Sequence, residues 1–547
     1  MHFPFRKSPS TSSARRTVTT VVAVASTIAV AVALSGCSTQ STSAAGHTYV
    51  EAEQALPPTL DPASFSGGTR AYLITMDSQL VAYAGSSLSV QPNSDNLVGV
   101  LAKSWKESAN RKQLTVTLNN YKSQYGNKLT SEDVLWSLQR GRAESPIVGF
   151  LSSNSIHIDK TNPITIISPT KFTFNLDSPT PIDMAMWAVP SFTILDATEI
   201  KKHTTAKDPW GTTWLKTHSA SFGPWGVSAF SQNNTLTLVP NKGYTGTRGN
   251  ITKVIMKQVA SSSDEAQLIQ SGAINYARDL TWNQLKSVEN SKKVTVELGA
   301  SISRDWMILQ QKSGPFKSVA VRQAISLALD RSALNQGALA GLGTASKAGF
   351  LPGYLKGVSG AKTIADNNVA KAKALLASAG YSSGFSFTLQ YSASQPGPEV
   401  DQLGVLIQSQ LKAIGITVNL SPFASGNDLQ QAESTGNYQA LLWSSGSALP
   451  SIYFEAGLIE PGSPNNSWSY DSQAYVDLVN QLGAATPGSS EYNDAVAKLT
   501  NLNVTDIPVV QLVDTPNAFV LSSNVTNLNK ALGTIMILPD PSQLNMN

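Results

Sequence analysis

Few residues in this 547-residue sequence have the types and the spacing that covalent or metal chemistry requires. The five histidines show no metal-ligand spacing, and a single cysteine leaves no thiolate pair for zinc. Ser-x-x-Lys occurs at 168–171 and at 359–362, and Ser-Asp-Asn occurs at 94–96. In serine acyl-transferases of the penicillin-binding type Ser-Asp-Asn follows Ser-x-x-Lys, whereas here it comes before both matches, and no Lys-Thr-Gly occurs. A serine acyl-transferase is therefore not predicted. Gly341 and Gly343 lack the third glycine of a nucleotide loop. No cofactor, metal site or catalytic residue is therefore predicted, and a glycosidase, whose two carboxylates lie about 5–10 Å apart in space, stays open.

Trp443 is the residue best placed for noncovalent binding, because it ends a predicted strand and a polar loop follows at 444–450. An aromatic ring in that position can form an apolar wall or stack on a ligand. We predict that the next residues, Ser444, Ser445 and Gly446, bind ligand with it. A tryptophan that only fills the end of the sheet fits the pattern equally well.

The elements that must position Trp443 form the clearest α/β pattern of the chain, over 366–445. Alternating apolar residues predict strands at 385–391, 416–420 and 439–443, separated by helices, and Asp366 is predicted to cap the helix before them. Helices between strands imply a parallel sheet, and ligands bind at the carboxyl ends of such strands. The loops 392–398 and 444–450 are therefore candidate ligand loops.

Earlier segments add strands and helices without evident chemistry. Strands are predicted at 48–55, 113–118, 171–176 and 251–259, and Thr130 with Asp133 predicts a capping box. The stretch 315–331 predicts one amphipathic helix with Ser318 at its N-cap. Arg322, outside its apolar face, is predicted to form a structural ion pair.

Charge excludes one class of partner. The net charge of +4 comes entirely from four basic residues before residue 17, which leaves 36 basic and 36 acidic residues in the rest of the chain. A neutral chain without a basic stripe is not predicted to bind nucleic acid.

The N-terminus has the pattern of a targeting segment. A basic stretch, an apolar run at 18–34 and Leu34-Ser35-Gly36-Cys37 predict a signal peptide over 1–36, followed by a Ser/Thr/Ala-rich spacer over 37–47. The residues before Cys37 resemble a bacterial lipobox, which implies lipidation of Cys37 and an extracytoplasmic chain anchored to the cell membrane. A transmembrane anchor is the alternative, but the apolar run is short for it.

Read in order, several blocks resemble the solute-binding proteins of the peptide/oligopeptide/nickel ABC importers. The matching blocks are 60–63, 101–105, 126–140, 238–244, 271–276, 315–331, 370–381 and 410–418. Each block alone is weak, whereas the ordered set spans nearly the whole mature chain.

The resemblance implies an α/β, two-lobe fold of the type II periplasmic-binding-protein kind, with a hinge between the lobes and an extra subdomain in the first. It implies lobe I at 48–84, 205–302 and 510–547, the extra subdomain at 85–204 and lobe II at 303–509. The chain would cross between lobes near Ser303 and near Val509.

Two departures from the family pattern bear on the ligand. The loop 444–450 has no carboxylate, and Gly446 stands about where an acidic residue would bind a peptide ammonium. Gln395 stands before Pro396, where dipeptide binders carry an arginine. Because a buried terminal charge needs a counter-charge, a neutral or capped peptide, or another solute, fits better than a free dipeptide.

Three further tryptophans are candidate ligand-binding residues. Trp225 lies in a segment that resembles the family's glycine-rich loop near the site, Trp306 lies near the hinge, and Trp468 lies in a Ser/Asn/Pro-rich loop. Packing in a core, or exposure at the rim for Trp468, is the alternative for each.

We therefore predict a monomeric, lipid-anchored receptor, not an enzyme, that captures a peptide or peptide-like solute and delivers it to an ABC permease with partner ATPases. The alternatives are the same fold binding a sugar, metal chelate or other small molecule, a sensor or adhesion factor with this fold, and a secreted lipoprotein hydrolase.

Overall fold

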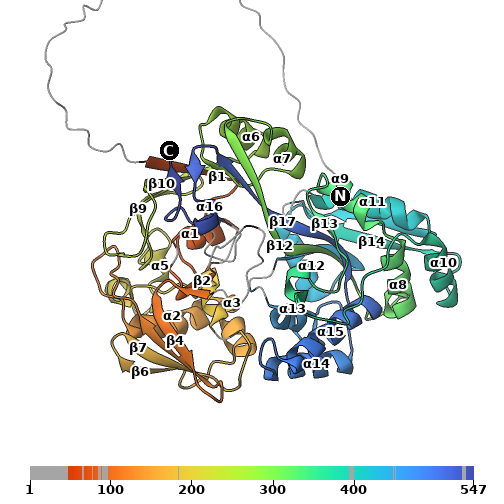
Figure 1. Ribbon diagram of the computed structural model, residues 1–547, viewed down its shortest axis with the longest axis horizontal. Coiled ribbons are helices and arrows are strands. Elements are labelled where there is room, and N and C mark those ends of the chain that lie inside the picture. Colours follow the sequence, from red (N-terminus) through yellow and green to blue (C-terminus); the bar gives the residue numbers. More distant parts are fainter. Residues whose placement is uncertain are drawn as a thin grey trace, which may run out of the picture. The chain divides into compact units, whose positions relative to one another are not determined.

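Two long antiparallel strands, β12 (Val294–Leu309) and β17 (Val510–Ser522), join the two halves of the fold (Figure 1). They lie in the middle of one 11-stranded sheet, in which ten strands follow the order β15-β14-β16-β12-β17-β11-β1-β10-β9-β8 and the short strand β13 (Thr344–Ala345) pairs with β17 outside this order. We call the half around β1 lobe I and the half around β14 lobe II. The ladder between β12 and β17 loses its register between Leu298 and Ser303, opposite residues 515–518. The predicted crossing near Ser303 lies at the end of this irregular stretch, whereas Val509 lies just before β17.

The computed structural model describes residues 47–64, 67–76, 78–83, 88, 97–182, 184–393, 399–446, 449, 451–531 and 538–547. The predicted signal peptide, Cys37 and nearly all of the spacer lie outside these residues. In the described part of the chain, no helix combines the length and the hydrophobicity needed to span a membrane.

The predicted parallel sheet of lobe II is confirmed. Strand β14 (Phe385–Tyr391) pairs in parallel with both β15 (Ile416–Pro422) and β16 (Ala440–Gly446). The crossover helices are α11 (Glu399–Lys412) and α12 (Gly426–Thr435). Apolar cores on both sides of the sheet hold these elements, so the carboxyl ends of β14 and β16 come to one edge.

Further helices complete lobe II, and three local predictions about them are wrong. They are α8 (Val319–Ala328), α9 (Arg331–Ala338), α10 (Val369–Ser378), α13 (Ile452–Ile459), α14 (Gln473–Ala484) and α15 (Ser490–Thr505). Ser318 is the N-cap of α8, but its side chain makes no capping bond. The predicted single helix ends at Ala328, because Asp330 caps a second helix at Arg331. Asn368 caps α10 instead of Asp366.

Lobe I has a parallel centre and an antiparallel edge. Strand β1 (His47–Glu53) lies between the parallel strands β10 (Ile251–Gln258) and β11 (Tyr276–Ala277). The edge is β9 (Thr235–Pro240) and β8 (Trp225–Ser231). The helices of this lobe are α1 (Gly67–Met76), α5 (Thr212–Leu215), α6 (Ser262–Ser271), α7 (Trp282–Val288) and α16 (Leu528–Ala531).

A four-stranded antiparallel sheet with its own core lies inside the predicted extra subdomain. Its order is β4 (Ala102–Glu107), β5 (Gln113–Leu118), β7 (Lys171–Asn175) and β6 (Ile164–Ser168). Helix α2 (Ser131–Glu144) packs on it and begins with the predicted capping box between Thr130 and Asp133, which is confirmed. Helix α3 (Pro146–Phe150) follows and leads toward lobe II.

Candidate functional site

Trp443 and Ser444 lie in the middle of β16, which continues to Gly446, so the prediction that Trp443 ends its strand is wrong. Trp443 pairs with Trp306 on β12 and is partly buried against the core on one side of the sheet, where Trp306 is only 5% exposed. Ser444 pairs with Asp305, on the other side of the same strand. The two predicted tryptophans are therefore neighbours. Trp306 also packs in the core of lobe II, which agrees with the alternative prediction that it is a core residue.

The other predicted ligand residues are not gathered at this point. Trp225 begins β8 in lobe I and is fully buried there, with the Arg248 guanidinium 5.4 Å from its ring centroid. Trp468 is 3% exposed in a lobe II core and is not a rim residue. The backbones of Ser445 and Gly446 belong to β16, and Gln395 lies outside the described residues. A ligand role for each of these residues stays a prediction.

A buried network fixes β12 against β17 at the edge of lobe II. The Arg304 guanidinium binds the Asp514 carboxylate at 2.5 Å and donates to the carbonyl oxygens of Ala348 and Phe350. Asp514 also accepts from the Ser346 hydroxyl, and its Oδ2 has no hydrogen-bond partner. Nearby, burial raises the pKa of Glu455, on α13, to about 8. This edge therefore carries more buried carboxyl groups than guanidinium groups.

Asp305 is the residue at this edge that sequence reasoning missed. It is 2% exposed, and its Oδ2 accepts from the Thr515 hydroxyl at 3.4 Å while its Oδ1 has no partner. Burial and the neighbouring Glu399 carboxyl raise the pKa of Asp305 well above its usual range. An acid directly before the apolar run Trp306–Leu309 was the only sequence signal for it.

The two lobes contact each other away from the shared strands. Leu449 is fully buried in the core of the extra subdomain, and Tyr453 and Phe454 at the start of α13 pack against the same core. Arg111 in the subdomain donates to the Ala485 carbonyl oxygen at 3.4 Å. These contacts would be broken if the lobes moved apart.

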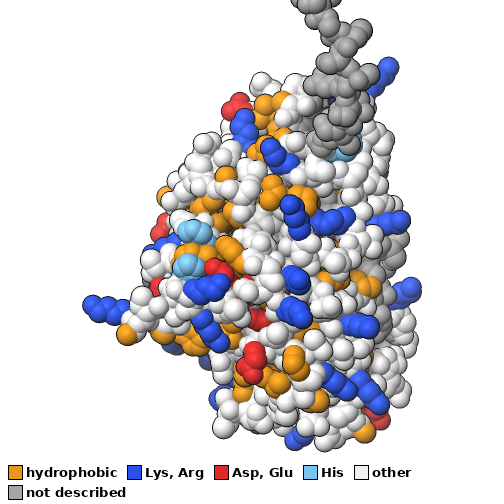
Figure 2. All heavy atoms as spheres, turned by 90° about the vertical axis from the view of Figure 1, so that its left-hand side faces the viewer, with side chains coloured by type: hydrophobic (Ala, Val, Ile, Leu, Met, Phe, Trp, Pro, Cys, Tyr) orange, Lys and Arg blue, Asp and Glu red, His pale blue; other side chains and the backbone are white. Residues whose placement is uncertain are grey.

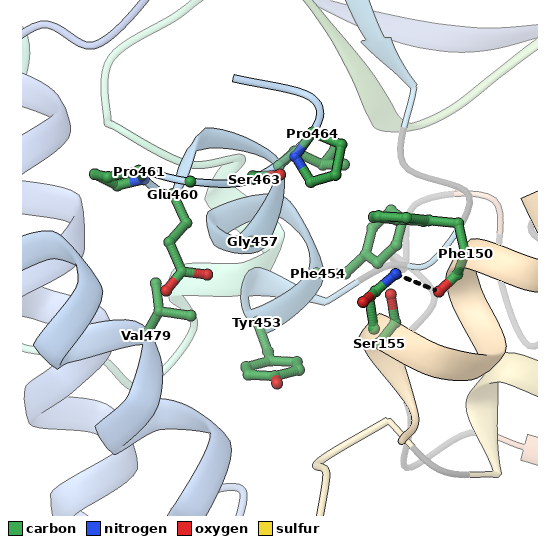
Figure 3. Close-up of a pocket in the computed structure, with 13 residues that line it drawn as sticks. Phe150, Ser155, Tyr453, Phe454, Gly457, Glu460, Pro461, Ser463, Pro464 and Val479 are labelled. Atoms are coloured by element: carbon green, nitrogen blue, oxygen red, sulfur yellow. Dashed lines mark hydrogen bonds between the residues drawn. The ribbon is translucent and has the colours of Figure 1, made fainter. Parts of the chain in front are cut away.

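A cavity of about 280 Å³ lies beside these contacts, between the extra subdomain and lobe II (Figure 3). Phe150 and Ser155 face it from the subdomain, and Tyr453 and Phe454 face it from α13. Burial raises the pKa of Glu460, which also lines the cavity. The volume is near the lower end for small-molecule sites, which are about 300–1,000 Å³. Among the side chains that the structure describes, none of the predicted ligand residues lines this cavity.

The charges of lobe I differ between its surface and its interior. Lysine and arginine side chains are spread over the face in Figure 2, where acidic side chains are fewer. Several carboxyl groups are instead buried on β1 and beside it. Within the residues that the structure describes, no three His, Cys, Asp or Glu side chains are grouped as a metal site requires.

Two lobes that share a pair of crossing strands, with a cavity and apolar contacts between them, define the class of two-lobe solute-binding proteins. The chain belongs to the bacterial extracellular solute-binding proteins, family 5, whose middle region matches residues 96–458. The predicted family is thereby confirmed.

Relatives and solved structures agree with this assignment. The chain is 27% identical over 455 residues to "Probable D,D-dipeptide-binding periplasmic protein DdpA" of Escherichia coli K12, covering 80% of this chain and 83% of the relative. The Helicobacter pylori periplasmic binding protein DppA with the peptide STSA is 20% identical, has a TM-score of 0.75 and matches 92% of this chain and 98% of its own. AgaA of A. tumefaciens R10 with agropinic acid is 22% identical, has a TM-score of 0.76 and matches 92% and 99%. The predicted two-lobe type II fold is confirmed.

Proposed function

We propose that this protein is the solute receptor of an ABC importer and that it captures a peptide or peptide-like solute between its lobes. The observation that carries the proposal is the pair of shared strands, β12 and β17, in a chain whose residues 96–458 match the solute-binding family. The DdpA relative is named as a D,D-dipeptide-binding protein, which supports a peptide-like solute. The likeness to AgaA keeps a non-peptide solute as the second candidate.

The proposed mechanism is closure. The solute binds lobe II beside Trp443, lobe I closes over it, and the closed form docks on the permease. Shifting an open-to-closed ratio from 99:1 to 1:99 takes about 5.5 kcal/mol of differential binding. Aromatic contacts and backbone hydrogen bonds, at about 1 kcal/mol each, can supply this from a handful of groups.

The membrane arrangement is part of the proposal. The signal peptide would be removed before Cys37, and the lipid on Cys37 would hold a monomer at the outer surface of the cell membrane. The partners are a permease and ATPase subunits, which hydrolyse ATP. The same proposal includes the boundaries given above for lobe I, the extra subdomain and lobe II. It also includes a ligand-binding role for Trp443, Ser444, Ser445, Gly446, Gln395, Trp225, Trp306 and Trp468.

Tryptophan fluorescence tests the receptor proposal against a hydrolase. We expect a saturable change in emission with short peptides, since Trp443 lies next to the proposed site, and full recovery of the unchanged peptide by liquid chromatography and mass spectrometry. Sugars and a nickel–histidine complex serve as non-peptide probes. A saturable change with one of these and with no peptide would show that the solute is not a peptide. Protein-dependent cleavage of a probe would instead favour the hydrolase.

A further inference from the structure

Four buried or half-buried carboxyl groups gather at the carboxyl ends of β1 and β11 in lobe I. We call Glu51, Glu53, Glu265 and Asp279 the acid set. Glu51, Glu53 and Glu265 are each at most 2% exposed, and Asp279 lies two residues after β11. Ligands of open α/β sheets bind at this end of the strands. The acid set therefore lies at the edge of lobe I where a solute is expected.

One arginine is too little to balance the acid set. The Arg278 guanidinium pairs with Glu53 and lies 4.0 Å from Asp279. Glu51 is hydrogen-bonded to Glu53, and Glu265 accepts from the Asp279 amide at 3.0 Å. Burial raises the pKa of Glu265 to about 8 and that of Glu51 well above its usual range. These carboxyl groups therefore ionise less readily than usual unless a cation joins them, and among the described side chains no second cationic group is paired with the acid set.

Several oxygen atoms in and beside the acid set have no partner. They are Glu53 Oε1, Glu265 Oε2, Gln258 Oε1 and the Tyr49 hydroxyl. Tyr49 is completely buried, and this burial, together with the Glu51 carboxyl, raises its pKa. Gln258 pairs with Glu53 across β10 and β1, so the two side chains are on the same side of the sheet. Buried polar atoms are almost always satisfied in folded proteins. Glu53 Oε1 and Gln258 Oε1 lack a partner as acceptors, and the Glu265 carboxyl can join them as an acceptor when it is ionised, so together they can accept the three N–H bonds of one ammonium group.

The facing part of lobe II is acidic too. The Glu399 and Asp514 carboxyl groups raise the pKa of Asp305 and the Ser444 and Thr515 hydroxyls lower it, while Asp514 is itself paired with Arg304. Trp282 of lobe I lies four residues after Arg278, and its indole is hydrogen-bonded to Glu399 of lobe II. Acidic groups thus stand on both sides of the contact between the lobes. Closure over a positive charge is favoured by both sets, whereas closure over an anion is opposed by both.

We infer that the solute carries a positively charged group, an amine or a guanidinium, and that the acid set of lobe I binds it. This inference rests on the proposed function, since it names the charge of the solute for the same cleft. It also revises one sequence expectation: the missing carboxylate in 444–450 does not leave an ammonium without a counter-charge. The missing arginine at Gln395 still predicts poor binding of a free carboxylate.

Four matched probes separate charge from shape: Ala-Ala-amide, N-acetyl-Ala-Ala-amide, Ala-Ala and N-acetyl-Ala-Ala. Calorimetry on the full mature chain is expected to show Ala-Ala-amide binding at least about tenfold more tightly than its acetylated form, with N-acetyl-Ala-Ala weakest. The Glu265→Gln variant keeps the shape of the side chain and should lose most of that tenfold preference. Glu433→Gln, in α12 and bonded to Ser467, is the matched control and should keep it.

The outcomes distinguish the inference from the proposed function. Equal or tighter binding of N-acetyl-Ala-Ala-amide overturns the inference and leaves the receptor standing. If no peptide probe binds but n-butylammonium raises the melting temperature of the wild type and not of Glu265→Gln, the cationic site stands and the peptide assignment fails. Stabilisation by K⁺ or Ca²⁺ and by no amine, or by none of these probes, overturns the inference.

Discussion

The Arg322→Ala variant is expected to lose about 3–5 kcal/mol of unfolding free energy, because buried carbonyl oxygens would lose their donor, while its folded fraction keeps its affinity for solute. Arg322 is 4% exposed and makes five hydrogen bonds to four carbonyl oxygens, those of Phe316, Lys317, Asp506 and Ile507. It therefore ties the end of α15 to the start of α8. The predicted ion pair is wrong, because the guanidinium binds backbone carbonyl oxygens and the Asp506 carboxylate bonds to Tyr470 instead.

Urea unfolding followed by circular dichroism measures this loss. Gln323→Ala is the matched control, because the next side chain on α8 donates one bond, to the Thr505 carbonyl oxygen at 2.6 Å, and should cost only about 1 kcal/mol. Loss of solute binding by fully folded Arg322→Ala protein would place α8 in the cleft and contradict its structural role.

The Leu449→Ala variant is expected to weaken solute binding about tenfold or more with a smaller effect on unfolding. Leu449 belongs to the lobe II segment, yet its side chain is fully buried in the core of the extra subdomain. Burying a leucine contributes about 1.5–3 kcal/mol, and this contribution exists only while the lobes are in contact. Truncating Leu449 therefore raises the free energy of the closed form and leaves that of the open form nearly unchanged.

Leu429→Ala is the control for this prediction. Leu429 is equally buried, but in a core that lies within lobe II. Its truncation should cost about 2–5 kcal/mol of unfolding free energy and leave the affinity unchanged. The closure mechanism is wrong if the two variants show the opposite pattern in calorimetry and urea unfolding.

Local sequence patterns were sufficient where strands and helices alternate. The strands 113–118 and 385–391 have the predicted bounds, because alternating apolar residues leave one register in which the core face is filled. The capping box at Thr130 was also predictable, since both partners are three residues apart. Asp366 fails because Asn368, two residues further on, caps the helix instead, and Ser318 occupies the N-cap of α8 although its side chain makes no capping bond.

The charged parts of the site could not be predicted from the sequence in the same way. The acid set joins residues 51–53 to 265 and 279, and Asp305 meets Ser444 across a ladder of two distant segments. Glu51 and Glu53 alternate with apolar residues on β1, and this was the available signal, although it also fits a solvated strand face. The roles of Gln395 and of the loop after Gly446 were predicted from residues that lie largely outside the described part of the chain.

Closure of the lobes on a solute is the central claim, and the distance between spin labels on the two lobes measures it most directly. Cys37 is the only cysteine, so a Cys37→Ser chain with Lys171→Cys in the extra subdomain and Lys498→Cys on α15 carries one label on each side. We expect a broad distance distribution in the free protein that becomes shorter and narrower with a saturating solute. An unchanged distribution under conditions where calorimetry shows the solute bound would contradict the account.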